Sequence, residues 1–236
     1  MLQNAIQKTG RSIVLSLSPG PALPEKAWIY EKYANMWRIT DDLWDKWEDI
    51  LNMFNRCEIW QEHVGTGCYP DCDMIPFGHL GKGFGHEWTC NLTYDEQRTL
   101  MSLWCIFRSP LMLGCELTLL DDKTKELITN EDILHLTGHS DGARQIKRDS
   151  DEVIWASRDE KAGVYYIALF NLSDCDRKIE MPDQKVYEII DIINGSTGSI
   201  NNPISEIMEL WDHRSCDKAG GNINAHGACL YRIKID

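Results

Sequence analysis

The chain has 236 residues, 43 % of them hydrophobic, which is enough for one large domain or two modest ones with a buried core. The formal net charge of −13 argues against nucleic-acid binding through phosphate neutralisation and against membrane attachment through basic residues. No apolar run approaches about 18 residues, so the sequence predicts no transmembrane helix. A neutral partner such as a sugar fits this charge balance.

The cysteines argue against a disulfide-stabilised protein. There are nine of them, an odd number, and no Cys-x-x-Cys pair occurs. The first residues lack the apolar segment of a signal peptide, so both features favour a reducing compartment such as the cytoplasm. His63, Cys68 and Cys72 do not follow a standard zinc-binding spacing. We therefore expect no zinc site at these three residues.

Residues 1 to about 140 alternate between helical and strand-like patterns. In chain order we expect a helix over 1–8, a buried parallel strand over 12–18, an amphipathic helix over 41–56, a strand over 57–64, a helix over 94–107, a strand over 110–114, and short helices over 122–128 and 130–136. A capping box, Thr93 to Glu96, precedes the helix over 94–107. This alternation predicts about three βα units around a parallel sheet.

The pattern changes after residue 142. Six β-rich runs separated by turn residues follow, over 152–158, 163–171, 177–181, 186–193, 204–211 and 227–235. We find no helical period in this region. The sequence therefore predicts an α/β domain over residues 1–142 and an antiparallel, all-β domain over residues 143–236.

Two pairs of carboxylates lie in a predicted loop or where a loop leads into a predicted helix, and such loops carry the chemistry in barrel folds. Asp41 and Asp42 end the stretch WRITDD, and Asp71 and Asp73 lie in YPDCDM. Both pairs also have a structural explanation, because acids in a first helical turn gain about 0.3–1 kcal/mol each and Pro and Asp form turns. Arg38 is spaced to pair with Asp42 at i,i+4. Spacing alone leaves both explanations open.

Five segments resemble the second half of glycoside hydrolase family 27, the α-galactosidase (melibiase) family. They occur in the order KTGRSIVLSLSPGPA, ANMWRITDD, YPDCDMIPFGHLG, SLWCIFRSPLMLG and LITNEDIL. The resemblance implies a partial (β/α)8 TIM barrel, about three C-terminal βα units, followed by an antiparallel β-sandwich. It also implies a retaining glycosidase that cleaves terminal α-galactosyl linkages with two carboxylates and no cofactor.

The resemblance assigns roles to single residues by motif. Asp42 falls on the general acid/base, and Arg38 falls on an arginine that helps to hold the sugar and the nearby carboxylates. Asp73 and Met74 fall on a pair that lines the sugar pocket, and Asp71 matches a more structural acid.

The first loop departs from the family pattern. Ser18 stands where α-galactosidases of the family commonly carry a glutamate, and Pro21 and Ala22 stand where larger residues are usual. Small side chains beside the sugar O2 leave room for an acetamido group, as in relatives that accept such sugars. We therefore count Ser18 among the substrate-binding residues. The alternatives α-N-acetylgalactosaminidase and β-L-arabinopyranosidase stay open.

The resemblance places the family nucleophile in a Lys-x-Asp-like motif at the end of an earlier strand, in a segment that precedes this chain, so we expect neither this motif nor a nucleophile here. The fragment is then expected to be inactive alone. Its expected partners are a galactose-configured oligosaccharide or glycoside and a chain that carries the first half of the barrel. The non-enzymatic alternative is a carbohydrate-binding or structural remnant, in which Asp42 only caps a helix.

Overall fold

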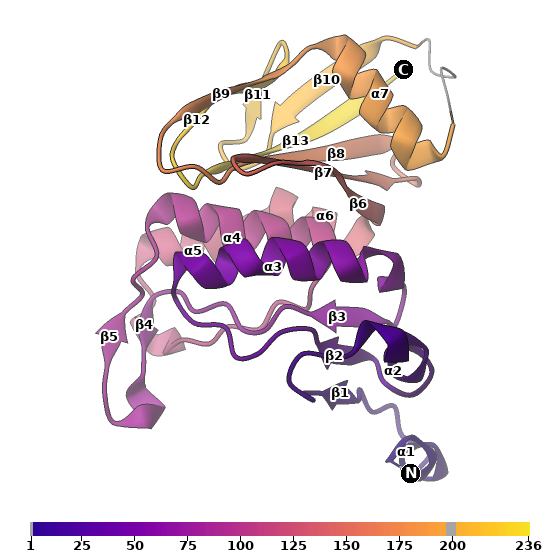
Figure 1. Cartoon of the computed structure of the whole chain (residues 1–236), viewed down its shortest axis with the longest axis vertical. Coiled ribbons are helices and arrows are strands. Elements are labelled where there is room, and N and C mark those ends of the chain that lie inside the picture. The colour runs from indigo at the N-terminus through magenta and orange to yellow at the C-terminus, as the bar shows by residue number, and fades with distance from the viewer. Residues whose placement is uncertain (1, 197–201) are drawn as a thin grey trace.

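The computed structural model of the protein describes residues 2–196 and 202–236 and has two stacked parts (Figure 1). The lower part in that view contains a small parallel sheet and a layer of helices, and the upper part contains antiparallel strands. This layer of helices lies between the two sheets (Figure 1).

The lower part comprises the elements of residues 2–139. They are α1 (Leu2–Lys8), β1 (Ser16–Leu17), α2 (Ala27–Tyr33), β2 (Met36–Arg38), α3 (Trp47–Trp60), β3 (Tyr69–Asp71), β4 (His79–Leu80), β5 (Trp88–Thr89), α4 (Tyr94–Phe107), α5 (Asp122–Thr129) and α6 (Glu131–His139). The predicted helices over 94–107, 122–128 and 130–136 are confirmed. The predicted first helix is confirmed from Leu2, and Met1 lies outside the described residues.

The parallel sheet has the order β1-β2-β3. Leu17 pairs with Trp37, and Arg38 pairs with Asp71, so the three strands end at the same edge. A further segment continues this pattern beyond β3, because Gly114 N–H donates to the Ile75 carbonyl at 3.0 Å. The predicted parallel sheet is therefore present, with strands of only two or three residues.

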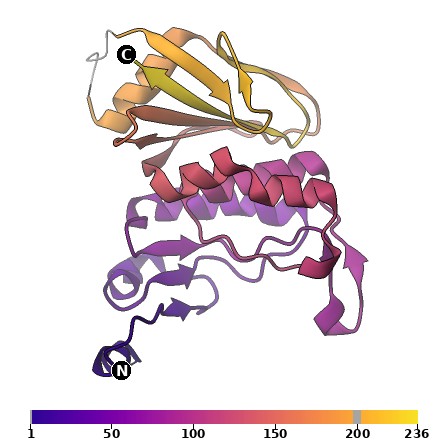
Figure 2. The ribbon, with the colours of Figure 1, turned by 180° about the vertical axis from the view of Figure 1, so that it is seen from behind.

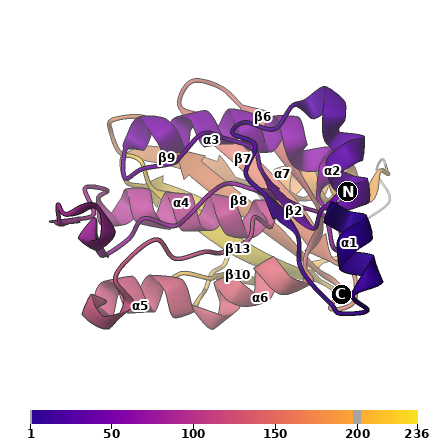
Figure 3. The ribbon, with the colours of Figure 1, turned by 90° about the horizontal axis from the view of Figure 1, so that it is seen from below.

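The helix layer supplies most of the core of the lower part. α4 buries ten of its fourteen residues, which follows from its position between the two sheets. α3 lies beside α4 (Figure 3), and α5 and α6 complete the layer on the other side (Figure 2). A helix that is buried nearly all round needs apolar residues on every face, as α4 has between Leu100 and Phe107.

The upper part is a six-stranded antiparallel sheet with a second layer on its outer face. Its elements are β6 (Asp141–Arg148), β7 (Glu152–Asp159), β8 (Val164–Asn171), β9 (Arg177–Met181), α7 (Asp183–Asn194), β10 (Ile204–Glu209), β11 (Arg214–Ser215), β12 (Ala219–Ile223) and β13 (Ala228–Ile235). The large sheet has the order β11-β10-β13-β8-β7-β6. The second layer consists of β9 paired with β12, together with α7. Five of the six predicted strands are confirmed.

The sixth prediction, a strand over 186–193, is wrong, because this segment forms α7. Val186, Ile189, Ile190 and Ile193 are its buried residues, and their spacing of three and four places them on one helical face. The helix follows Pro182 and ends at Gly195, whose φ of 65° suits a C-terminal cap. The sequence analysis finds no helical period in this region, but the buried residues of this segment do follow one.

The predictions for residues 41–64 are wrong in two places. The helix begins at Trp47 rather than Asp41, and it continues through the predicted strand to Trp60. Cys57 and Trp60 are buried on the same face as Ile50 and Phe54, so the helical period runs on. The next strand is β3, which is too short to show a periodic pattern.

The predicted buried strand over 12–18 is also mostly absent. Only Ser16 and Leu17 pair with a neighbour, and Val14 is 72 % exposed. The predicted strand over 110–114 is reduced to one bridge between Leu113 and Ile75. Within the described residues, no helix has both the length and the apolar character that crossing a membrane requires.

Candidate active site

The carboxyl ends of β1, β2 and β3 gather the residues that the sequence analysis singled out. Arg38 ends β2 and Asp71 ends β3, side by side in the parallel register. Ser18 directly follows β1, the neighbour of β2 on the other side. Because parallel strands end at one edge of the sheet, their following loops meet there, and such edges hold the ligand sites of α/β folds.

Arg38 is the centre of this site. Its guanidinium lies 3.1 Å from the Asp42 carboxylate, 2.8 Å from that of Asp73 and 3.8 Å from that of Asp71. The Arg38 side chain is only 17 % exposed, so its contacts with the buried Asp71 and Asp73 take place largely out of water. One positive charge is thus shared among three carboxylates, and the structure brings together Arg38, Asp42 and Asp73 as the motif predicted.

Asp73 is held more tightly than any other member of the cluster. Its φ of 78° lies in the left-handed region that L residues rarely adopt. Its own N–H donates to Asp71 Oδ1 at 2.9 Å, its Oδ2 accepts from Leu43 N–H at 2.7 Å, and its carbonyl accepts from Trp104 Nε1 at 3.1 Å. These bonds aim the carboxylate at Arg38, which is why the unusual backbone conformation persists.

Asp42 differs from its neighbours because its side chain is 79 % exposed. It lies in the loop between β2 and α3, and the first-turn acids of α3 are Glu48 and Asp49. The explanation of Asp41 and Asp42 as helix-terminal acids is therefore wrong. Tertiary hydrogen bonds keep this loop out of the helix, among them the one from Leu43 N–H to Asp73.

The remaining predicted residues lie at the same edge with weaker connections to the cluster. Met74 is partly buried and packs against Gly114, where an added Cβ would lie 2.4 Å from its sulfur. Ser18 is exposed, and the described part of the chain shows no hydrogen bond from it to the cluster. Burial raises the pKa of Asp71 above its ordinary value of 3.8.

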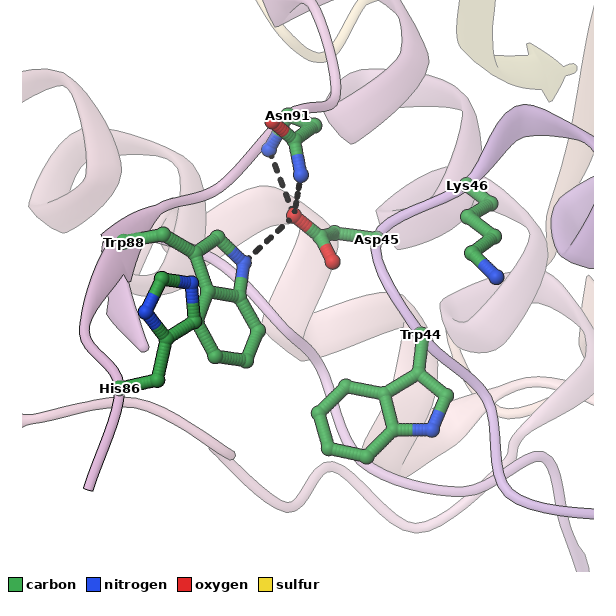
Figure 4. A pocket seen from close by; sticks show the side chains of 6 residues that line it. All are labelled: Trp44, Asp45, Lys46, His86, Trp88 and Asn91. Carbon is green, nitrogen blue, oxygen red and sulfur yellow. Dashed lines mark hydrogen bonds between the residues drawn. The ribbon is translucent and has the colours of Figure 1, made fainter. Parts of the chain in front are cut away.

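A pocket of about 540 Å³ adjoins this loop, and the sequence analysis did not anticipate it. It is lined by Trp44, Asp45, Lys46, His86, Trp88 and Asn91 (Figure 4). Asp45 is buried, and its Oδ2 accepts three hydrogen bonds, from Trp88 Nε1 at 3.0 Å and from Asn91 N–H and Nδ2 at 2.7 Å each. In the sequence, Asp45 is visible only as a third acid in the stretch DDLWD. Its hydrogen-bond partners Trp88 and Asn91 lie more than forty residues further along the chain.

The residues considered as metal ligands do not come together. His63 pairs with Glu31, while Cys72 lies 3.6 Å from Cys57. The Cys68 thiol contacts the Glu31 carbonyl. Among the described residues, no group of three His, Cys, Asp or Glu is arranged to hold a metal ion, and all nine cysteines are free thiols.

A Lys-x-Asp triplet does occur in this chain, at its C-terminus. Lys234, Ile235 and Asp236 lie at the end of β13, in the antiparallel sheet and on the far side of the molecule from β1 to β3 (Figure 1). This triplet therefore does not belong to the Arg38 cluster.

Comparison with known proteins places the site in a family context. The family model described as alpha galactosidase A matches residues 1–138. The chain is 25 % identical to alpha-galactosidase 2 of Arabidopsis thaliana over 98 % of its own length and 54 % of that protein. It is 27 % identical to alpha-N-acetylgalactosaminidase of Gallus gallus over 82 % of its own length and 50 % of that protein.

A solved structure gives a higher identity. The arabinose complex of a β-L-arabinopyranosidase of glycoside hydrolase family 27, from Geobacillus stearothermophilus, superposes with a TM-score of 0.87 and 38 % identity. The match covers 99 % of this chain and 53 % of that one. The chain thus spans about half the length of the relatives that it matches.

Proposed function

The chain belongs to glycoside hydrolase family 27, the family of alpha galactosidase A, and from this premise we propose that it supplies the acid/base half of a retaining α-galactosidase site. The enzyme cleaves terminal α-galactosyl linkages. The observation that carries the proposal is the Arg38 guanidinium, which joins Asp42, Asp71 and Asp73 at the edge of the parallel sheet.

Asp42 is the general acid/base in this proposal. In a retaining mechanism one carboxyl group protonates the leaving oxygen and later removes a proton from water, so it must reach both substrate and solvent. Asp42 meets this requirement, because its carboxylate is largely exposed while Arg38 fixes its direction. The buried carboxylates of Asp71 and Asp73 do not have this access.

Asp73, Met74 and Ser18 bind the sugar in this proposal. Each carboxylate oxygen of Asp73 has one protein partner, and a second lone pair on each remains for a sugar hydroxyl. Met74 forms an apolar wall next to it. Ser18, at the end of β1, presents a small side chain near the sugar O2.

The nucleophile comes from polypeptide outside these 236 residues in this proposal. A retaining site needs a second carboxylate about 5–5.5 Å from the acid/base. The buried carboxylates of Asp71 and Asp73, which share Arg38 with Asp42, are already bound to this guanidinium. The chain is then inactive by itself, and it acts together with polypeptide that supplies this second carboxylate.

A second specificity is favoured by one observation. The relative with 38 % identity is a β-L-arabinopyranosidase. A β-L-arabinopyranoside has the ring configuration of an α-galactoside without the hydroxymethyl group, so one site can hold either sugar. Ser18, Pro21 and Ala22 also leave room for the acetamido group of an α-N-acetylgalactosaminide.

The test is a chimera that joins the N-terminal half of the Geobacillus enzyme to this chain. Its hydrolysis of nitrophenyl α-galactoside, β-L-arabinopyranoside and α-N-acetylgalactosaminide is measured side by side. We expect the α-galactoside to have the highest kcat/KM and Asp42→Asn to lower kcat by about 10²–10⁴-fold.

Asp41→Asn is the matched control, because Asp41 is an adjacent exposed carboxylate that makes no ion pair with Arg38. It should keep most of the activity. A folded chimera without activity on any of the three substrates, or equal losses in the Asp41 and Asp42 variants, contradicts the proposal. If one of the other two substrates has a higher kcat/KM, the proposed α-galactoside specificity is wrong, but the role of Asp42 as acid/base still stands.

A further inference from the structure

The backbone that carries Asp73 rests against the C-terminal end of α4, where two side chains bind it. Ser109 Oγ accepts from Cys72 N–H at 3.0 Å, and Trp104 Nε1 donates to the Asp73 carbonyl at 3.1 Å. The Cα atom of Asp73, from which the carboxylate projects, lies between these two bonded groups along the chain. Ser109 and Trp104 are fully buried, so the loss of either bond leaves a backbone group in a place that water does not reach.

The way in which α4 ends brings Ser109 to this contact. Arg108 follows the last helical residue and has a φ of 66°, in the left-handed region. Ser109 N–H then donates to the Trp104 carbonyl at 2.9 Å, which closes the helix as a Schellman cap does. Glycine is the usual residue at this left-handed position, so an arginine there carries a backbone cost.

The Arg108 side chain offsets this cost by joining three other segments. Its Nε donates to the Thr137 carbonyl at 3.2 Å, its guanidinium pairs with Asp141, and it lies over the Tyr69 ring at 5.9 Å from the centroid. Tyr69 begins β3, the strand that ends at Asp71. The residue that turns the chain at the end of α4 therefore also fixes α4 relative to the strand that leads into the site.

Asp73 and Arg108 lie on opposite sides of this contact and share an unusual backbone conformation. Only four non-glycine residues of the described part of the chain have a positive φ, and these are two of them. Such conformations persist where the surrounding bonds over-determine them, and they gather at functional sites. Without the bonds from α4, we expect the Asp73 backbone to relax from its φ of 78°, which turns its carboxylate away from the Arg38 guanidinium.

We propose that Trp104 and Ser109 are positioning residues for the carboxylate of Asp73. This inference rests on the proposed function, in which that carboxylate accepts hydrogen bonds from sugar hydroxyls. Both side chains are fully buried, so they act through Asp73 rather than on the sugar itself. Their loss should weaken sugar binding more than it slows the chemical step, because the acid/base is a different residue, Asp42.

The first test follows Leu43 N–H, which donates to Asp73 Oδ2 at 2.7 Å. Its hydrogen exchange in the 236-residue chain, measured by NMR, reports how firmly this carboxylate is held and needs no activity. Trp104→Phe and Ser109→Ala each remove one of the two bonds from α4. We expect each to speed exchange at Leu43 by about twofold to tenfold, the range for one hydrogen bond, relative to Phe54 N–H in the middle of α3.

The matched controls come from the same helix. Ser102 is also fully buried in α4, and its Oγ accepts from Trp211 Nε1 at 2.9 Å. Ser102→Ala and Trp211→Phe therefore remove a bond of the same kind that joins α4 to the upper part instead of to the site. These two variants should leave the ratio of Leu43 to Phe54 exchange unchanged. An unchanged ratio in both site variants, or an equal rise in the controls, overturns the inference.

The chimera adds a kinetic test that separates the two proposals. For the substrate that it hydrolyses best, Trp104→Phe and Ser109→Ala should raise KM by about twofold to tenfold and change kcat less. Ser102→Ala and Trp211→Phe should leave both constants as they are. A lower kcat at unchanged KM in the site variants overturns the inference. A folded but inactive chimera overturns the proposed function alone, because exchange at Leu43 still decides whether α4 holds the carboxylate.

Discussion

At the scale of single residues, Asp73 combines a charge that the site uses with a backbone conformation that costs stability. Asp73→Gly and Asp73→Ala both remove the partner of Arg38 and of Leu43 N–H, so each should lower the free energy of unfolding by about 1–3 kcal/mol. At a φ of 78° alanine carries a further cost that glycine does not. We therefore expect Asp73→Ala to be less stable than Asp73→Gly by about 1 kcal/mol.

Urea unfolding followed by tryptophan fluorescence measures this difference. The two variants lack the same carboxylate, so their comparison isolates the backbone contribution. If the alanine variant is as stable as the glycine variant, the left-handed conformation is not kept in the absence of the carboxylate.

Asp71 gives a prediction about pH. Burial raises its pKa above 3.8, so the folded protein favours the protonated carboxyl group more than the unfolded chain does. This contribution to stability is complete below the unfolded pKa and is lost as the pH rises through the folded pKa. The unfolding free energy of the wild type, relative to Asp71→Asn, should therefore fall as the pH rises from about 4 through the folded pKa of Asp71.

Unfolding in urea at several pH values checks this slope. Asparagine keeps the oxygen that accepts from Asp73 N–H, so the variant is a close match to the wild type. A difference that stays constant across this range, or one that grows with pH, contradicts the prediction.

The sequence identifies residues of the candidate site better than it identifies the residues that hold them in place. Arg38 and Asp42 were paired by their spacing, and their side chains lie 3.1 Å apart, although the segment is not a helix. The sequence does not single out Asp45, because its partners Trp88 and Asn91 are distant in the chain. The hairpin that brings them close has no recognisable local sequence pattern. Contacts between segments distant in the chain decide which acid is buried.

At the scale of elements, the capping box that the sequence predicts at the start of α4 is present in the structure. Thr93 Oγ1 accepts from Glu96 N–H at 3.3 Å, and Glu96 Oε2 accepts from Thr93 N–H at 2.7 Å, as the capping box predicts. Thr93→Ala removes the first bond and should lower the free energy of unfolding by about 1 kcal/mol. Thr93→Ser keeps the hydroxyl and should stay within about 0.5 kcal/mol of the wild type.

Thermal or urea unfolding compares these two variants directly. A serine variant as unstable as the alanine variant would mean that the threonine methyl group, rather than the cap, supports the start of α4.

Long elements with a periodic pattern of apolar residues can be predicted from the sequence. Short strands that form only because they pair with a neighbouring strand cannot. α4 matches its predicted bounds because both its cap and its apolar face are local. β2 and β3 have three residues each and exist because they pair with neighbours, so their own residues carry little signal. The prediction of a strand over 186–193 overlooks the helical spacing of the buried residues of α7.

At the scale of the whole molecule, the two parts share one core. Successive residues of β7 and β8 face opposite sides of the sheet, and the side with Trp155 and Phe170 meets the helix layer. Phe54 of α3 packs edge-on against Phe170 at 5.0 Å, and Phe107 of α4 packs edge-on against Trp155 at 6.0 Å. The predicted division after residue 142 falls inside β6 and stays a prediction.

This shared core predicts that the protein unfolds in one step. Phe170→Ala should lower the free energy of unfolding by about 3–5 kcal/mol, because a fully buried ring is replaced by a cavity between the helix layer and the sheet. Ile192→Ala, on the exposed side of α7 with 49 % of the residue accessible, should cost less than about 1 kcal/mol.

Urea unfolding is followed by far-ultraviolet circular dichroism, which reports the helices, and by tryptophan fluorescence. With a common core, both signals move together to lower urea in the Phe170 variant. Two separate transitions, with Phe170→Ala shifting only one, would mean that the parts fold independently and that the contact between α3 and β8 contributes little.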